Sequence, residues 1–197
     1  MTFAVERLNE GVRATIMAHF LALPMNDRRL RFGTALAPGA IAAYVDRIDF
    51  DHGGVFGVHD DRLDLVGVAH VAFEDDLAEL GLSVLPAHRG RGVGGALFER
   101  AVAYARNRCI PRLFMHFLSE NAPIVRIARR FRMHIVTRAG EADAHLNLPP
   151  ASLTSIAGEF VMDAFALYDR ALKAMVAAWT QRRLRRQGAS AGERSTL

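Results

Sequence analysis

A short stretch rich in glycine and arginine constrains the fold of this chain more than any other feature. Residues 89–95 read RGRGVGG and stand between an apolar segment at 77–86 and an apolar, helix-like segment that continues to about Arg108. Glycine allows a close approach to the backbone, and the N–H groups that open a helix bind anions. The pattern therefore predicts a strand, a phosphate-binding loop and a helix in immediate succession.

Two kinds of phosphate site use such a loop. Gly90, Gly92 and Gly95 satisfy the G-x-G-x-x-G spacing of a dinucleotide-binding turn, and Glu120 stands where that site needs a carboxylate for the ribose. However, residues 86–89 separate the strand from the first glycine, and about eighty residues precede the motif. The plainest alternative is a structural turn followed by the start of a solvated basic helix. The second kind of phosphate site is a pyrophosphate cradle led by an arginine, and the sequence favours this interpretation.

The hydrophobic pattern predicts a mixed α/β fold. Strands are expected at 3–8, as a hairpin within 53–76, and at 77–86, 112–118, 133–139 and 142–148; helices are expected at 11–23, 40–48, after the glycines, at 122–131 and at 152–186. Residues 24–39 are expected to form a loop or broken helix. The apolar run 112–118 is typical of a strand buried on both faces, and Asn121 is placed to cap the helix that follows. Strands outnumber helices in the middle of the chain, which favours a mixed sheet over a doubly wound one.

Composition limits the size and setting of the protein. The 197 residues, 51% of them apolar, suffice for one domain with an appendage. Pro149 and Pro150 mark a boundary, so we expect a domain at 1–150, a helical extension at 151–186 and a disordered tail at 187–197. The single cysteine excludes an internal disulfide and favours a cytoplasmic location. No signal-peptide pattern and no apolar run of about 20 residues is present, so no membrane partner is expected.

Charge and histidine spacing narrow the possible partners. The net charge is +4, and arginine supplies all but one of the 25 basic residues. These arginines are spread out and do not alternate with aromatic residues, so no specific nucleic-acid partner is expected. The eight histidines show no H-x-x-x-H spacing and have no partner cysteines, so no metal is expected either.

The glycine loop and its surroundings resemble a known family. Residues 89–94 fit the pattern [Arg/Gln]-x-x-Gly-x-[Gly/Ala], and residues 78–106 as a whole resemble the strand, loop and helix of the GNAT acetyltransferase superfamily. Residues 113–131 resemble the strand, asparagine and helix that follow. The resemblance implies a GNAT fold, with a central, mixed, mostly antiparallel twisted sheet of about seven strands flanked by helices, and here a C-terminal helical extension. It also implies an acyltransferase that moves an acetyl group from acetyl-CoA directly to a primary amine of a small molecule or protein.

The resemblance implies a specific cofactor site. In such proteins the strand before the loop separates from its neighbour, and the pantetheine arm of acetyl-CoA lies in the gap. Backbone groups of Leu82 and Val84 would bind that arm, and Asn121 would contact the cofactor in addition to capping its helix. The pyrophosphate would lie against backbone N–H groups and arginine side chains, which belong to Arg89, Gly90, Arg91, Gly92, Val93, Gly94 and Gly95.

The resemblance also implies proton transfer. An amine with a pKa of about 10 must lose a proton before it attacks, and Glu79 is the candidate base or else a solvated carboxylate. The usual tyrosine acid is missing, because Ala128 stands in its place and Arg132 replaces the expected glycine. Ser119, a water molecule or Tyr168 could act instead, unless no acid is needed. This departure keeps open an alternative, an acyl-CoA-binding regulatory domain with little or no turnover.

The acceptor itself is not encoded in a motif. Residues 24–39 lie where the family builds its acceptor site, and Arg28, Arg29 and Arg31 would suit an acceptor that also carries a carboxylate or phosphate. Alternatively, they pair with acidic neighbours, which are Asp27, Asp46 and Asp49. The long C-terminal helix could cover the sheet, close the acceptor site or form a homodimer, and we favour the homodimer.

Overall fold

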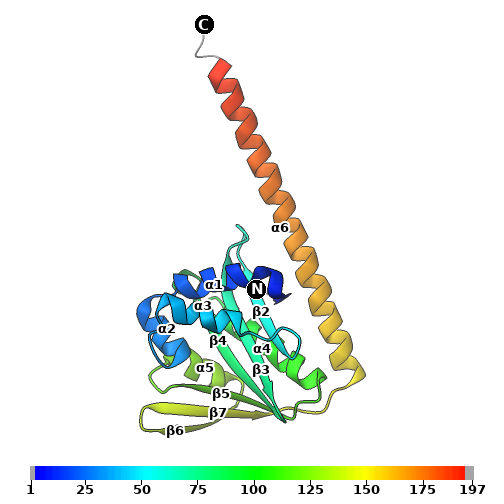
Figure 1. The fold of residues 1–197 in the computed structure, drawn as a ribbon. Coiled ribbons are helices and arrows are strands. Elements are labelled where there is room, and N and C mark those ends of the chain that lie inside the picture. Colours follow the sequence, from blue (N-terminus) through cyan, green and yellow to red (C-terminus); the bar gives the residue numbers. More distant parts are fainter. Residues whose placement is uncertain (1–2, 194–197) are drawn as a thin grey trace.

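A computed structural model describes residues 3–193, with side chains through residue 179. It has seven strands in one open sheet with helices on both faces (Figure 1), in the order β1-β2-β3-β4-β5-β7-β6. Neighbouring strands are antiparallel except for β4 and β5, which are parallel. The mixed, mostly antiparallel sheet expected from the sequence is therefore confirmed.

The elements follow the predicted order closely. The strands are β1 (Glu6–Leu8), β2 (Gly53–His59), β3 (Leu65–Glu74), β4 (Leu77–Val84), β5 (Arg112–Leu118), β6 (His134–Arg138) and β7 (Glu141–Asn147). The α-helices are α1 (Arg13–Ala22), α2 (Met25–Phe32), α3 (Pro38–Asp46), α4 (Val93–Asn107), α5 (Ala122–Arg130) and α6 (Leu153–Glu193), with short 3-10 turns η1 (Glu10–Val12) and η2 (Pro86–His88). Both predicted hairpins form, β2–β3 and β6–β7.

Two expectations need correction or completion. Residues 24–39 contain a regular helix, α2, which ends at Gly33 with a φ of 77°. The prediction that β5 is buried on both faces is wrong. Leu113, Met115 and Phe117 are buried, whereas Arg112 and His116 on the opposite face are exposed. Burial alternates because β5 pairs with antiparallel β7 as well as with parallel β4, and only one face of this part of the sheet is packed.

Two apolar cores lie on opposite faces of the sheet. One packs α4 and α5 against the strands and includes Phe56, Leu97 and Phe98, which are completely buried. The other packs α1 and α3 against β2 and β3 through residues such as Ile16 and Phe20. Because both faces are covered at β3 and β4, the end of β4 lies between α1–α2 on one side and α4–α5 on the other.

Among the described strands, the one parallel pair separates along its length. β4 and β5 are paired from Leu77–Arg112 to Glu79–Phe114 and no further. β4 nevertheless stays paired with β3 as far as Val84. The β5-facing backbone edge of residues 80–84 is therefore free of sheet hydrogen bonds, which is the separation that the resemblance implied.

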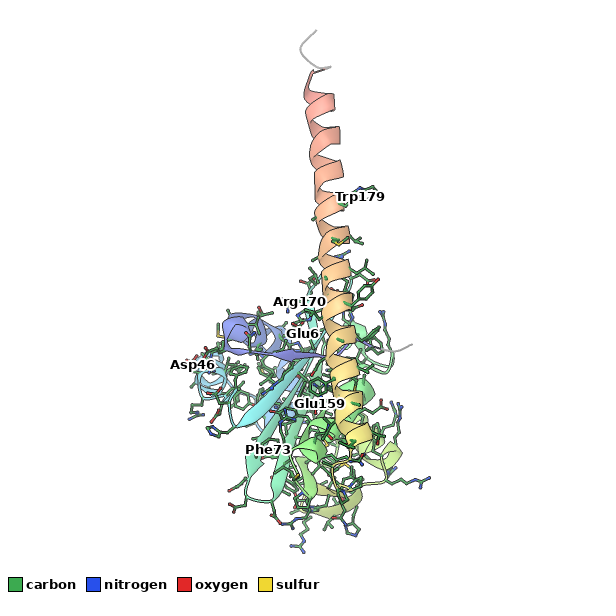
Figure 2. All side chains as sticks on the ribbon, turned by 90° about the vertical axis from the view of Figure 1, so that its right-hand side faces the viewer. Glu6, Asp46, Phe73, Glu159, Arg170 and Trp179 are labelled. Atoms are coloured by element: carbon green, nitrogen blue, oxygen red, sulfur yellow. The ribbon has the colours of Figure 1, made fainter. Side chains whose placement is uncertain are left out.

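The last helix leaves the domain. α6 is a single helix that runs beside α4 and β1 and then continues past the sheet (Figures 1 and 2). It extends to Glu193, beyond the expected end at 186, while residues 194–197 lie outside the described residues. The division of the chain into domain, extension and tail stays a prediction.

Candidate functional site

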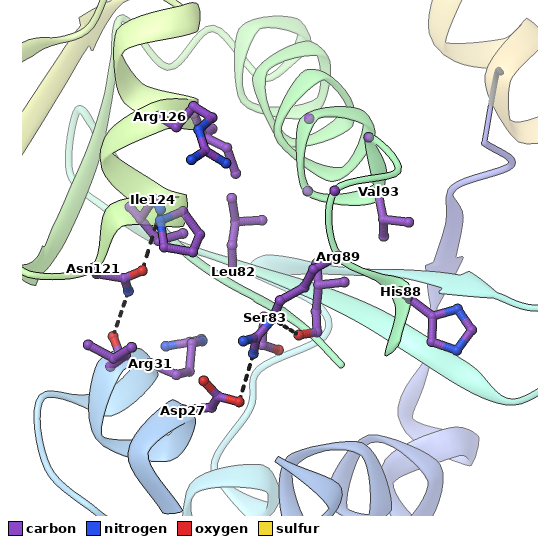
Figure 3. Close-up of a pocket in the computed structure, with 18 of the residues that line it drawn as sticks. Asp27, Arg31, Leu82, Ser83, His88, Arg89, Val93, Asn121, Ile124 and Arg126 are labelled. Atoms are coloured by element: carbon purple, nitrogen blue, oxygen red, sulfur yellow. Dashed lines mark hydrogen bonds and ion pairs between the residues drawn. The ribbon is translucent and has the colours of Figure 1, made fainter. Parts of the chain in front are cut away.

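A cleft of about 300 Å³ opens at the end of β4 (Figure 3). Its lining comes from the ends of α1 and β4, from α2, from the loop after β4, from the first turn of α4 and from α5. All the residues predicted to bind the cofactor line this cleft, except Arg91, which is exposed outside it. The structure therefore brings the two matched sequence segments together around one space.

The glycine loop, residues 89–95, has a backbone that other residues rarely adopt. Gly90 and Gly92 have φ angles of 73° and 99°, in the left-handed region that glycine enters without strain. Gly92 is the N-cap of α4, and the first intrahelical hydrogen bond runs from the Ala96 N–H to its carbonyl at 3.0 Å. The N–H groups of residues 93–95 consequently have no intrahelical partner, so the start of α4 can receive an anion.

The next two glycines serve helix packing as well. A Cβ at Gly94 would stand 2.9 Å from Cδ1 of Ile127, and one at Gly95 would stand 3.0 Å from a nitrogen of Arg130. Both contacts are closer than ordinary carbon neighbours allow. Glycine at these two positions therefore leaves room for α5, which packs against the loop.

Arg89 reaches across the cleft instead of pointing into solvent. Its Nε donates to the Val84 carbonyl at 3.0 Å, and its guanidinium pairs with Asp27 of α2 at 2.8 Å (Figure 3). Val84 is one of the residues whose backbone is expected to bind the cofactor. A ligand that donated to the Val84 carbonyl would share this oxygen with Arg89 or replace its hydrogen bond.

The cleft carries a surplus of positive charge. Four arginines line it, Arg31, Arg89, Arg126 and Arg130, whereas Asp27 is the carboxylate among its lining residues. Sequence reasoning did not single out Arg126 and Arg130. Their i, i+4 spacing on a helix with one apolar face could have indicated that both point the same way. Such a cleft suits a ligand with several negative charges.

Asn121 joins the two sides of the cleft. It is 6% exposed; its Oδ1 accepts from the Ile124 N–H at 3.4 Å, and its Nδ2 donates to the Leu30 carbonyl at 3.1 Å. The first bond is the predicted helix cap. The second ties α5 to α2, and sequence reasoning gave no sign of it.

The predicted catalytic side chains do not line the cleft. Glu79 is exposed on β4, nearer the start of that strand. Ser119 donates its hydroxyl to the Gly140 carbonyl at 3.0 Å and so supports the β6–β7 hairpin. Tyr168 lies on α6 and is 68% exposed. The roles given to Glu79 and Ser119 stay predictions.

A buried histidine and serine meet at the cleft, and the sequence did not predict them. Nδ1 of His19 lies 2.9 Å from the Leu65 carbonyl, and its Nε2 lies 2.8 Å from Oγ of Ser83. Burial lowers the pKa of His19 to about 4, so the ring is neutral near pH 7. Its Nδ1–H then donates to Leu65, and Nε2 accepts the hydroxyl proton of Ser83.

Arg31 lies on the same side of the sheet. It donates to the Tyr44 hydroxyl at 3.1 Å, and that oxygen lies 2.8 Å from Nδ1 of His70. Burial, with the Arg31 charge as a smaller cause, lowers the pKa of His70 to about 4. We call His19, Arg31, Tyr44, His70 and Ser83 the Arg31 cluster.

The other two α2 arginines have different roles. Arg28 donates to the carbonyls of Leu21 and Leu23 at the end of α1, and Arg29 pairs with Glu120 at 2.7 Å. The alternative that these arginines pair with Asp27, Asp46 or Asp49 is therefore wrong. Asp27 pairs with Arg89, and the cleft receives only Arg31 from this trio.

Solved structures with the same fold are acetyltransferases of the GNAT type. The GNAT domain of S. lividans PAT superposes with a TM-score of 0.64 at 20% identity, covering 73% of this chain and 89% of that one. A putative acetyltransferase, YncA of Salmonella typhimurium with its cofactor acetyl-CoA, superposes with a TM-score of 0.58 at 14% identity, covering 77% and 97%. At these identities the likeness establishes the fold.

Sequence comparison establishes the family. Residues 25–132, more than half of the chain, match the model of the acetyltransferase (GNAT) family. The chain therefore belongs to the acetyltransferase (GNAT) family. A streptothricin acetyltransferase of Streptomyces lavendulae is 31% identical over 74 residues, which are 38% of this chain. The chain matches 39% of the length of that relative.

Proposed function

We propose that this protein transfers an acetyl group from acetyl-CoA to a primary amine. One observation carries the proposal: the free backbone edge of β4 leads directly to the unpaired N–H groups of residues 93–95. A pantetheine arm needs backbone partners of the first kind and a pyrophosphate needs those of the second. The positive charge of Arg126 and Arg130 beside the loop supports the same placement.

The residues of the chain would divide the work as follows. The glycine loop binds the pyrophosphate through its backbone, and Leu82 and Val84 hold the pantetheine arm along β4. Arg89 exchanges its bond to Asp27 for a phosphate oxygen, since a charge-assisted bond to a doubly charged group is the stronger one. Acetyl-CoA supplies the thioester carbonyl that the amine attacks.

The proton balance uses few side chains. Glu79 is the proposed base, and it would act through water because it stands outside the cleft. Ala128 is a completely buried residue of α5, so no tyrosine hydroxyl is available at that position. A thiol with a pKa of about 8.5 can leave as the thiolate without an acid, so turnover does not require Ser119.

A second candidate is an acyl-CoA-binding domain with little turnover. Two observations favour it: Ala128 replaces the usual acid, and the Ser119 hydroxyl already has a partner. Both candidates need the same cofactor site. They differ only in whether CoA is released.

CoA release measured against a panel of primary amines, streptothricin included, tests the proposal. We expect turnover with at least one amine and calorimetric binding of acetyl-CoA. Binding without turnover on the whole panel would favour the regulatory domain. Glu79→Gln should lower the rate most at acidic pH if Glu79 is the base, and an unchanged pH profile would remove it from that role.

We also propose that α6 forms a homodimer. In the part of α6 whose side chains are described, charged residues pair with its own domain: Glu159 and Asp163 pair with Arg100, and Arg170 pairs with Glu6 (Figure 2). Large apolar side chains project outward at alternating steps of four and three residues, which is the spacing of a helix–helix seam. They are 44% to 68% exposed and comprise Val161, Phe165, Tyr168, Leu172 and Met175.

Light scattering tests the dimer. Tyr168→Glu in the seam should give monomers, whereas Leu167→Glu, next to it but outside the seam, should leave dimers. A wild-type monomer at all concentrations would contradict the proposal, as would sedimentation with lipid vesicles.

No helix in the described part of the chain is long and apolar enough to cross a membrane. The cytoplasmic location stays a prediction.

A further inference from the structure

Arg31 carries a charge that no carboxylate in the described residues balances. Among the described residues it donates to the neutral Tyr44 hydroxyl, and its buried Nε–H has no hydrogen-bond partner there. Its guanidinium carbon lies 4.8 Å from the ring centroid of Phe32 and 5.8 Å from that of Tyr44. Aromatic rings hold a cation in place but leave its edge available to an anion.

The neighbouring strand is shaped around this guanidinium. A Cβ at Gly81 would overlap the Arg31 nitrogens, so the absence of a side chain there allows Arg31 to lie over β4. Gly81 and Ser83 are two residues apart on β4 and face the same side of the sheet, with about 7 Å between their backbones. Arg31 and Ser83 both line the cleft, as Figure 3 shows.

Ser83 presents one kind of hydrogen bond to the cleft. Its hydroxyl proton is donated to Nε2 of His19, because the Leu65 carbonyl fixes the other ring nitrogen as the donor. The Ser83 oxygen therefore offers only lone pairs to a ligand. An amine N–H is a suitable partner, whereas a carboxylate is not.

The available carboxylate in this cleft is already committed. Asp27 pairs with Arg89 at 2.8 Å and forms no ion pair with Arg31. A cofactor phosphate that drew Arg89 away would release Asp27, which lies four residues before Arg31 on α2, so an acidic acceptor would compete with Asp27 for the edge of the guanidinium. The buried Nε–H of Arg31, which has no partner among the described residues, is what points to an anion on the second substrate.

We infer that the acceptor is an amine that carries an acidic group in the same molecule, with the acid on Arg31 and the amine nitrogen beside Ser83. The inference rests on the proposed acetyl transfer and narrows its substrate class. A carboxylate and a phosphonate share the required charge and geometry. Cationic amines are disfavoured because Arg31 repels them.

A matched set of small amines tests the inference. β-Alanine, β-alaninamide and 2-aminoethylphosphonate have the same amine and spacer and differ only in the terminal group. With acetyl-CoA saturating, we expect kcat/KM to be at least about tenfold higher for an acidic amine than for the amide, through KM more than kcat. Calorimetric binding to the CoA-loaded protein should show the same order without any turnover.

Three variants locate the effect. Arg31→Gln should bring the acid and the amide to within about twofold of each other. Gly81→Ala should have a similar effect, because it displaces the guanidinium and leaves its charge. Arg29→Gln on the same helix is the control, since Arg29 pairs with Glu120 outside the cleft; it should keep the preference. A melting curve for each variant establishes that it is folded.

The outcomes separate this inference from the proposed function. Loss of the preference in Arg31→Gln or Gly81→Ala, but not in Arg29→Gln, supports the role of Arg31. Equal turnover of β-alanine and its amide by the wild type overturns the inference and leaves acetyl transfer intact. No turnover with any amine, but Arg31-dependent binding of the acid, overturns the proposed reaction alone. Equal binding of all three compounds overturns the acidic acceptor.

Discussion

The two sides of the cleft are built on different principles. The glycine loop and the first turn of α4 come from one continuous stretch, residues 89–96, and offer mainly backbone N–H groups. The Arg31 cluster takes side chains from α1, α2, α3, β3 and β4. A ligand that every family member shares can be bound by backbone, which any sequence supplies. A ligand specific to one member needs side chains, and here these are buried or half-buried neutral groups around one cation.

Lowering the pH should distinguish the two sides of the cleft most strongly, because the Arg31 cluster contains His19 and His70. His19 and His70 have pKa values of about 4 in the folded protein against an ordinary 6.5. The unfolded chain therefore binds protons in this range and the folded chain does not. The free energy of unfolding should fall as the pH drops from about 7 to about 4, by about 3 kcal/mol for each histidine. Urea unfolding at several pH values measures the slope.

Two variants show which histidines cause the pH dependence of the free energy of unfolding. His70→Gln should remove the part of that dependence that His70 contributes, because glutamine does not titrate. His134→Gln is the control and should leave that part in place, because His134 is exposed on β6, outside the Arg31 cluster. If the two variants gave equal slopes, the Arg31 cluster would not be the acid-sensitive region.

Gly94→Glu tests the backbone side of the cleft. Its new side chain must enter the cleft, since Ile127 stands 2.9 Å from the position of its Cβ. A carboxylate there repels the phosphates, so we expect the Kd for CoA to rise at least about 100-fold, or about 2.7 kcal/mol. Isothermal calorimetry measures the change. Gly39→Glu, in open space on α3, should bind normally, and unchanged affinity in folded Gly94→Glu would refute the placement.

Arg89 and Asp27 link the two sides and should have opposite effects. Arg89→Gln removes a positive charge from the phosphate site and should weaken CoA binding about tenfold, with a smaller loss at high salt. Asp27→Asn frees Arg89 from its partner and should tighten binding about threefold. The same calorimetric titration compares them. Changes of the same sign would mean that the pair supports the fold and does not compete with the cofactor.

Variants of Asn121 should have the smallest effect, and that effect concerns only the start of α5 and its contact with α2. Asn121→Ala removes both the cap on α5 and the bond to Leu30, and should cost about 1–2 kcal/mol of stability. Asn121→Ser keeps a capping oxygen and loses only the bond to Leu30, so it should cost less. Thermal unfolding ranks the two variants. Equal losses would indicate that the link between α5 and α2 carries the whole effect.

The sequence was sufficient to predict the features that depend on residues close together along the chain. The glycine loop, the Asn121 cap and both hairpins follow from local patterns and are present in the structure. The segment MNDRRLRF has few apolar residues, so the sequence predicts a loop or broken helix where α2 forms, although Pro24 and Gly33 stand at its two ends. Charged i, i+4 pairs such as Arg126 and Arg130 were within reach of the same reasoning.

The sequence could not predict what depends on tertiary packing. His19 and Ser83 are 64 positions apart and meet only because α1 lies across β3 and β4. Arg31 looked the same as Arg28 and Arg29 in the sequence, and the absence of a Cβ at Gly81 is what admits it to the cleft. The burial of β5 was predicted wrongly because strand composition does not tell which face a neighbouring helix covers.

Arg100 makes the start of α6 inseparable from the rest of the protein. Its side chain is 1% exposed, and its charge is balanced from α6 by Glu159 at 3.0 Å and Asp163 at 2.5 Å. A chain shortened at Pro150 would keep every residue of the sheet but would lose both carboxylates that balance this guanidinium, which lies 4.7 Å from the centroid of the Phe56 ring. Residues 25–132, which match the family model, contain Arg100 but not the carboxylates that pair with it.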